Sequence, residues 1–198
     1  MQESLEARIR EAHAAGNLQT AAAVAVEGYG PEVYGFLLAS LRSEQDAQEV
    51  YAVLCEDLWR GLPGFEWHSS FRTWLYRIAH HAMARHLRAP DRRRGRRVAL
   101  SEITEIAERV RSATAAHLRT ESKDALSRVR ESLSVEERSL LTLRVDRRLA
   151  WREIARVLAA EPLEASELDR ESARLRKRFQ LLKEEVARRM AKELEEET

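Results

Sequence analysis

Residues 69–79 read SSFRTWLYRIA, and no other stretch shows as clearly how this chain folds. Ser70 is a good helix N-cap residue, because its hydroxyl oxygen can accept a hydrogen bond from an amide of the first turn. An apolar stripe at helical spacing follows it: Leu75, Ile78, Ala79 and Ala82. This spacing predicts a helix over residues 71–88, ending just before Pro90.

On both sides of this run the sequence predicts further helices. With only 7 Gly, 4 Pro and few β-branched runs, we expect an all-α protein. The expected helices cover 2–15, two pieces of 18–41 broken near Gly28–Pro31, 44–60 capped by Ser43, 135–145 opened by a Ser134–Glu137 capping box, 151–159, and a long final stretch through Leu168.

The stretch 91–126 differs in composition from its surroundings. It begins with an arginine cluster, continues with Ser, Thr and Ala, and has few large apolar residues. Such a composition predicts a flexible linker with partial helix rather than a third core. We therefore expect two small helical domains, residues 1–90 and residues 127–198, the second with an acidic tail at 193–197.

Charge is distributed unevenly along a chain whose formal net charge is only +1. Nine arginines lie between Arg72 and Arg97 against one acid, and nine Lys or Arg lie between Arg170 and Lys192 against three Glu. Two separated basic segments favour two contacts with a polyanion. The alternative is that arginine-rich helices are merely solvated faces.

Aromatic side chains are interleaved with the first basic segment. Trp67, Phe71, Trp74 and Tyr76 lie among arginines and histidines, a mixture that suits bases stacked on rings and phosphates held by cations. Phe71 and Trp74 are expected in the core. Trp67 and His68 lie in a loop and are the better candidates for contact with melted DNA.

Residues 69–79 also resemble region two of the extracytoplasmic-function (ECF) sigma factors. The resemblance extends to Tyr29–Tyr34, Leu58–Arg60 and Leu62–Phe65, while Glu136–Leu141 and Trp151–Ala155 resemble sigma region four, a helix-turn-helix. It implies that the first domain binds the β′ clamp of core RNA polymerase and the −10 promoter element. The second domain would bind the −35 element and the β flap, and an anti-sigma factor becomes a candidate further partner.

The resemblance and the basic pattern together suggest site residues. The −10 candidates are Trp67, His68, Arg72, Arg77, His81 and Arg85. The −35 candidates are Arg170, Arg174, Lys177 and Arg178. The polymerase-binding candidates are Asp46, Val50, Ala52 and Val53.

Three departures from the family pattern keep a second reading open. Ala52 and Val53 stand where the family usually has Gln and Glu, and His81 and Arg85 stand where it usually has Asn and Asp. The turn at 159–169 is long, acidic and free of Gly. The alternative is a sigma-derived or free-standing helix-turn-helix regulator with weak polymerase engagement.

Catalysis, cofactors and a membrane location are not expected. The chain has no phosphate-cradling Gly-rich loop and no nucleophile elbow. His80, His81 and His86 have no familiar ligand spacing, so we expect no metal site, and Cys55 is the only cysteine and reads as a buried thiol. Without an apolar span or a signal peptide, the cytoplasm is the expected location.

Overall fold

The computed structural model describes residues 2–88, 101–118 and 129–196, and these residues contain helices and loops but no strand. The prediction of an all-α fold is therefore confirmed. The first helices are α1 (Gln2–Ala14), α2 (Leu18–Leu41), α3 (Glu44–Gly61), the short η1 (Leu62–Gly64), α4 (Phe71–Arg88) and α5 (Ser101–Leu118). The later ones are α7 (Val135–Leu141), η3 (Thr142–Asp146), α8 (Trp151–Leu158) and α9 (Ala165–Glu196).

Helix α2 is continuous, so the predicted break near Gly28–Pro31 is wrong. Pro31 lies inside the helix with its ring exposed, while Tyr29 and Val33 on either side are buried. Packing against α1, α3 and α5 holds both halves of α2. This tertiary packing outweighs the loss of one backbone donor at Pro31.

The predicted caps are confirmed. The Ser43 side chain accepts a hydrogen bond from the Asp46 amide at 3.1 Å, and Ser70 accepts one from the Thr73 amide at 3.0 Å. Ser134 and Glu137 form the reciprocal capping box at the start of α7. Each cap satisfies a donor that the first turn of a helix leaves free. Local side-chain chemistry thus sets where three helices begin.

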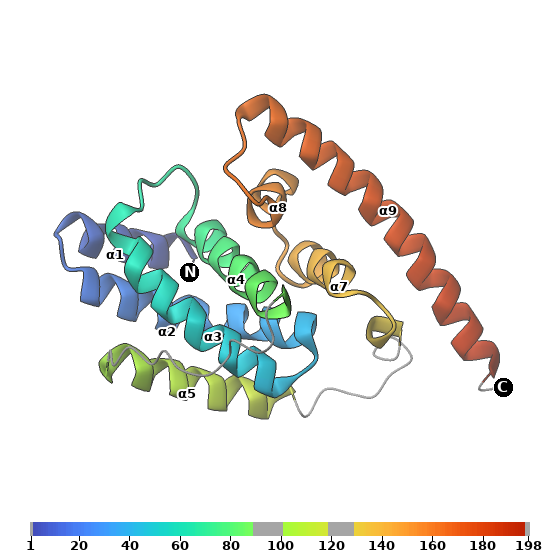
Figure 1. Cartoon of the computed structure of the whole chain (residues 1–198), viewed down its shortest axis with the longest axis horizontal. Helices are drawn as coiled ribbons and strands as arrows, with labels where there is room; N and C mark the ends of the chain where they lie inside the picture. The colour runs from blue at the N-terminus through green and yellow to red at the C-terminus, as the bar shows by residue number, and fades with distance from the viewer. Residues whose placement is uncertain (1, 89–100, 119–128, 197–198) are drawn as a thin grey trace.

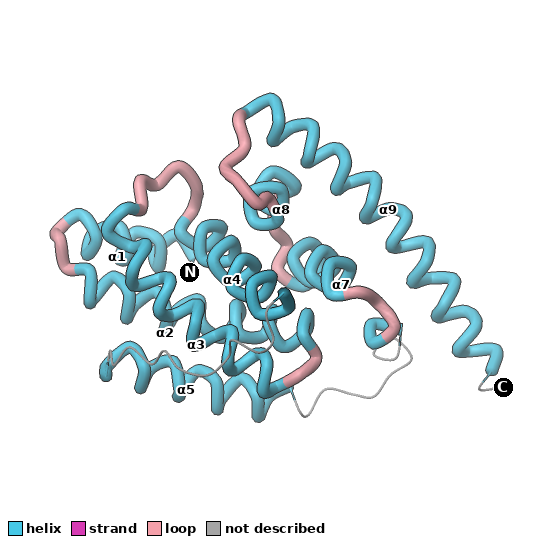
Figure 2. Tube along the Cα trace, viewed as in Figure 1, coloured by secondary structure: helices cyan, strands magenta, loops and turns pink. Residues whose placement is uncertain are grey.

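The carboxyl-terminal helices stack outward from α4. Figure 1 shows α8 and α7 lying between α4 and the long helix α9, and contacts join α4 to α8, α2 to α7, and α8 to α9. Two irregular segments, one just before α8 and one just after it (Figure 2), lie against α4. The buried residues of both helix groups belong to one continuous core.

Helix α5 packs against α2 and α3, with Ala107 and Val110 buried. It lies inside the predicted linker, of which residues 91–100 and 119–126 fall outside the described residues, as do the arginines from Arg92 to Arg97. The domain boundaries therefore stay a prediction. Close approach of α5 depends on Gly30, since a Cβ there would lie 2.5 Å from Tyr51 Oη and 3.1 Å from a Val110 methyl carbon.

In the described part of the chain, no helix is both long enough and apolar enough to cross a membrane.

We expect Gly30→Ala to lower the free energy of unfolding by about 1–3 kcal/mol, because the added methyl overlaps a rigid buried ring. Urea denaturation measures the change. Gly64→Ala is the matched control, since nothing lies within 4 Å of a Cβ there. Equal stability of the two variants would contradict the close packing of α5 on α2.

Candidate nucleic-acid interface

An aromatic cluster forms around the loop that leads into α4. Phe65 stacks on Trp74 with ring centroids 4.5 Å apart, and Trp67 lies 4.8 Å from Phe65. Phe71 is fully buried beside them, while Trp67 and Trp74 are partly buried. Trp67 adopts a φ of 62°, a left-handed conformation that few non-glycine residues take. The expected core role of Phe71 is confirmed, and Trp67 is held rather than freely exposed.

Helix α1 holds this loop from one side. The Arg10 guanidinium lies over the Trp67 ring, 4.5 Å from its centroid. The Trp67 indole N–H donates to His13 Nδ1 at 3.4 Å, and His13 Nε2 donates to the Leu62 carbonyl at 2.9 Å. One face and the polar edge of Trp67 are therefore engaged by α1.

Glu6 of α1 caps the start of α4, although the two lie far apart in the sequence. Its carboxylate accepts hydrogen bonds from the amides of Phe71 at 3.1 Å and Arg72 at 3.0 Å, and from the Tyr29 hydroxyl at 3.3 Å. A carboxylate at a helix N-terminus is also favoured by the helix dipole. Sequence reasoning missed Glu6, Arg10 and His13, because no local spacing links residues so far apart in the chain.

Arg72 is paired inside the protein. Its guanidinium makes a two-bond pair with Glu32 at 2.7 and 2.9 Å and also donates to the Arg147 carbonyl at 3.0 Å. Its side chain is only 15% exposed. Burial acts to lower the pKa of Arg72, but the hydrogen bond and charge of Glu32 outweigh it and raise the pKa. Arg72 is thus a structural cation in this conformation.

The other −10 candidates differ widely in exposure. His68 is 86% exposed in the loop, near Glu66, and Arg77 is partly buried on α4. His81 donates from Nε2 to the Ala159 carbonyl at 2.9 Å. Arg85 is exposed and pairs with Asp57 of α3. The structure therefore places the set on one loop and one helix without gathering it into a single open surface.

His80 is a partly buried titratable residue of α4. Its pKa is lowered to about 4, first by burial and then by the charge of His81, while Glu136 of α7 opposes the shift. Its Nδ1 is buried and has no hydrogen-bond partner among the described residues. His80 is therefore neutral at ordinary pH.

Helix α9 presents cations to solvent. Leu168, Ser172, Leu175, Phe179 and Leu182 form its buried stripe. The four −35 candidates, Arg170, Arg174, Lys177 and Arg178, are exposed away from that stripe. Trp151 of α8 packs on Phe179 with centroids 5.4 Å apart, and Arg144 lies over Trp151 at 4.8 Å. Helix α8 thus anchors α9, and the basic face of α9 points to solvent. This pair of helices has the outline of a helix-turn-helix.

The polymerase-binding candidates lie along α3. Ala52 and Val53 are exposed, Val53 to 40%, and Asp46 is partly buried. Val50 is only 1% exposed, so its side chain is part of the core and offers no surface to a partner in this structure. The reachable part of this predicted surface is therefore apolar at the two departure positions.

His86 of α4 lies between two carboxylates of α3. Its Nε2 is 2.8 Å from Asp46 Oδ1, and its Nδ1 is 4.0 Å from Glu49 Oε2. Three residues of these types are enough to hold a metal ion. Because the two nitrogens of one ring face different carboxylates, the arrangement fits an imidazole bridging to α3 better than converging ligands.

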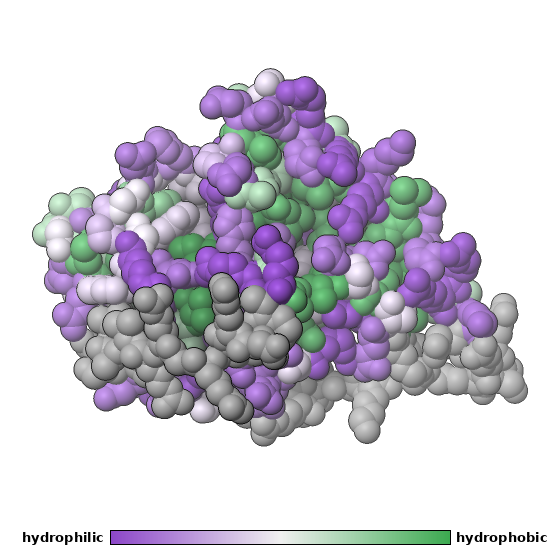
Figure 3. Space-filling model, viewed as in Figure 1, coloured by the Kyte–Doolittle hydropathy of each residue, from purple (hydrophilic) through white to green (hydrophobic). Residues whose placement is uncertain are grey.

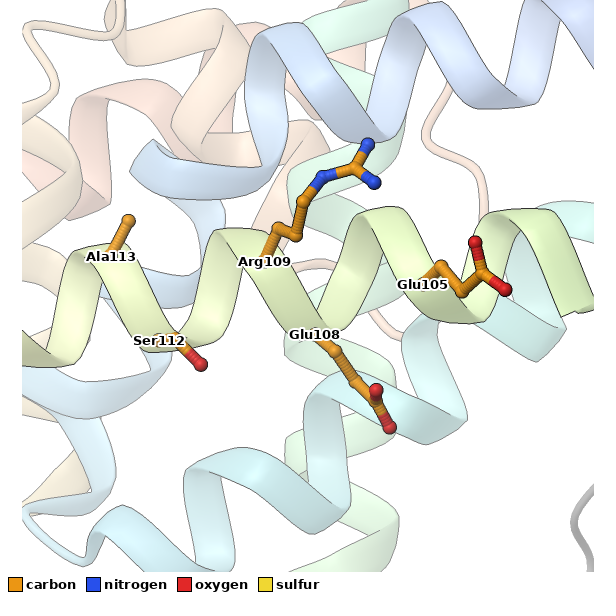
Figure 4. A pocket seen from close by; sticks show the side chains of 5 residues that line it. All are labelled: Glu105, Glu108, Arg109, Ser112 and Ala113. Atoms are coloured by element: carbon orange, nitrogen blue, oxygen red, sulfur yellow. The ribbon is translucent and has the colours of Figure 1, made fainter.

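A hollow beside α5 offers no comparable chemistry. Figure 4 shows its described lining, Glu105, Glu108, Arg109, Ser112 and Ala113, which comes from α5 alone. On the face seen in Figure 3 the described surface is mostly hydrophilic, with hydrophobic patches between. The exposed cations of α4 and α9 are thus the better candidates for a functional surface.

A basic helix face beside an anchoring helix, together with a separate loop that carries aromatic and basic side chains, is typical of proteins that bind nucleic acids. A family model for Sigma-70 region 2 matches residues 25–94. The chain is also 32% identical over 140 residues to the RNA polymerase sigma-H factor of Pseudomonas aeruginosa, an alignment that covers 66% of this chain and 70% of that protein.

The chain therefore belongs to the bacterial RNA polymerase sigma factors. Proteins of this family act in the initiation of transcription, and they are regulatory rather than catalytic. The predicted family is confirmed at this level.

Lowering the pH from 7 to 5 should destabilise the protein through His80. The unfolded histidine, with a pKa near 6.5, takes up a proton that the folded one refuses until about pH 4. The penalty is only a few tenths of a kcal/mol at about pH 7 and reaches about 2 kcal/mol at pH 5. Urea denaturation of wild type and His80→Gln at both pH values measures it. The pH 7 difference controls for packing, and an unchanged pH slope in the variant would contradict the assignment.

Proposed function

We propose that this protein is a sigma factor of the ECF type that binds core polymerase and promoter DNA with two helical domains. Residues 127–198 would read the −35 element and contact the β flap. Residues 1–90 would bind the −10 element and the β′ clamp. The observation that carries the proposal is α9, whose buried stripe faces α8 while Arg170, Arg174, Lys177 and Arg178 face solvent.

The −10 role of the first domain rests on the loop before α4. His68 is exposed there, and α1 fixes Trp67 in a strained backbone conformation, an arrangement that suits a preformed site. Arg77 and Arg85 add positive charge along the same helix. Bases unpaired from the duplex would meet aromatic and cationic groups together.

A second candidate function is favoured by α3. Ala52 and Val53 are exposed where the family usually has a polar, charged pair, so the chain could be a sigma-derived regulator with weak polymerase engagement. Both candidates share the DNA-binding surfaces. They differ in affinity for core polymerase.

Control by an anti-sigma factor and a cytoplasmic location also belong to this proposal, on the basis of family membership. We assign the protein no covalent chemistry and no cofactor. Its role would be to bind, position and help open DNA.

Arg174→Ala should weaken binding to promoter DNA that the wild-type holoenzyme selects from a random library. If Arg174 contacts a phosphate, the slope of log affinity against log salt falls by about 0.9. If it pairs with a base, specificity relaxes at one position instead. Arg188→Ala is the control, since Arg188 pairs with Glu185 outside the proposed set. No effect on affinity, slope or specificity would remove Arg174 from the interface.

Purified protein should co-purify with core polymerase and initiate transcription at selected promoters; failure of both would refute the proposal. The double variant Ala52→Gln/Val53→Glu should raise core affinity if the apolar pair weakens the clamp contact. Ala14→Gln/Ala15→Glu makes the same changes at exposed positions where α1 ends and is the control. Unchanged affinity in both double variants would argue against the second candidate.

A further inference from the structure

Two arginines of α8 lie on the side of that helix that is turned away from the core. Arg152 and Arg156 are four residues apart, so their side chains leave the same face of α8. Ile154, Ala155 and Val157 are fully buried on the remaining sides. Arg152 is 53% exposed, and the partly exposed Arg156 makes no ion pair with any residue that the structure describes. The outward face of α8 is therefore basic.

The position of α8 gives this face a relation to DNA. Figure 1 shows α8 beside the first part of α9, and the two helices are in contact. In a helix-turn-helix the second helix enters the major groove while the first helix crosses the phosphate backbone. With α9 as the proposed recognition helix, the arginines of α8 lie on the side where phosphates pass. Arginine is well suited to bind a phosphate, because its planar fork of N–H donors matches the phosphate oxygens.

Asp169 of α9 already holds one of these arginines. Arg152 Nε lies 3.2 Å from Asp169 Oδ1, and the Asp169 side chain is 65% exposed. Because both partners are open to solvent, the pair can separate without leaving a buried charge. While the pair is intact, its two charges cancel, and a nearby phosphate is attracted to it only weakly. The free protein thus presents a neutral pair where α8 alone would present a cation.

The acids around the start of α9 do not all have this effect. Residues 159–169 contain four acids and no Lys or Arg. The Glu167 carboxylate accepts a hydrogen bond from the Glu164 amide at 3.0 Å, a capping contact that stabilises the start of the helix. This contact accounts for Glu167 locally. Asp169 differs, because its carboxylate pairs with an arginine of another helix.

We propose that Asp169 limits the affinity of the second helix group for DNA by competing with a backbone phosphate for Arg152. Arg152 and Arg156 are then phosphate contacts of α8, and Asp169 sets how tightly the protein binds promoters in general. This inference rests on the proposed −35 role of α9. Phosphate contacts carry no sequence information, so weakening one of them leaves base contacts a larger share of the binding free energy.

Asp169→Asn tests the sign of this effect. In holoenzyme with core polymerase, the variant should bind a promoter duplex selected by wild-type holoenzyme about fivefold more tightly, because an exposed ion pair is worth up to about 1 kcal/mol. The slope of log affinity against log salt should steepen by about 0.9, the value for one further phosphate contact. Glu164→Gln is the matched control, since it removes the same charge from the exposed residue directly before α9.

A double-mutant cycle links the gain to Arg152. Arg152→Gln should lower the affinity for the duplex, because it leaves the Asp169 carboxylate unpaired beside the phosphates. In that background Asp169→Asn should gain no more than Glu164→Gln gains in the wild type. An equal gain with and without Arg152 would overturn the proposal, since Asp169 would then act only as a general negative charge. Circular dichroism verifies that the variants are folded.

Other roles of Asp169 predict the opposite sign. If Asp169 accepted a hydrogen bond from a cytosine amino group, Asp169→Asn would lower the affinity and relax specificity at one base pair. If Asp169 oriented Arg152 toward DNA, Asp169→Asn and Arg152→Gln would both lower the affinity. Either result would overturn the proposal. No binding of the duplex by wild-type holoenzyme would instead contradict the proposed function itself, and this inference with it.

Discussion

The ion pair between Arg72 and Glu32 is the interaction on which the rest of the arrangement depends. It ties α4 to α2 with two short hydrogen bonds, and the same guanidinium reaches the Arg147 carbonyl of the carboxyl-terminal helices. Both side chains are largely buried, so loss of either partner would leave an uncompensated charge, which is strongly destabilising. One cation therefore helps to orient α4 and to hold the second helix group against it.

The structure gives the helices flanking this pair distinct tasks. Helix α1 caps α4 through Glu6 and holds Trp67 with Arg10, so it fixes both the start of α4 and the loop before it. Helix α8 anchors α9 through Trp151 and Phe179 while it also covers α4. The short helix α8 therefore holds the basic helix α9 and α4 in one packed arrangement.

Helix positions were largely predictable, because their signals are local. The caps at Ser43, Ser70 and Ser134 and the apolar stripes of α4 and α9 each follow from residues within one or two turns. The prediction at Pro31 was wrong for the opposite reason. A proline is a local signal for a break, but packing on both halves of α2 overrides it. Val50 shows the same limit, since family position suggested a contact and burial places it in the core.

The sequence by itself determined the all-α class and the basic character of α4 and α9, since composition and helical periodicity record these directly. The family followed from the resemblance of particular motifs, residues 69–79 above all. Only the tertiary structure decided what the basic residues touch. Arg72 and His81 meet partners 75 and 78 residues away, and Glu6 caps amides 65 and 66 residues away. Such pairings depend on how helices cross rather than on spacing within any helix. The run 69–79 therefore identifies the family, while the fold determines which of its residues are buried, paired or exposed.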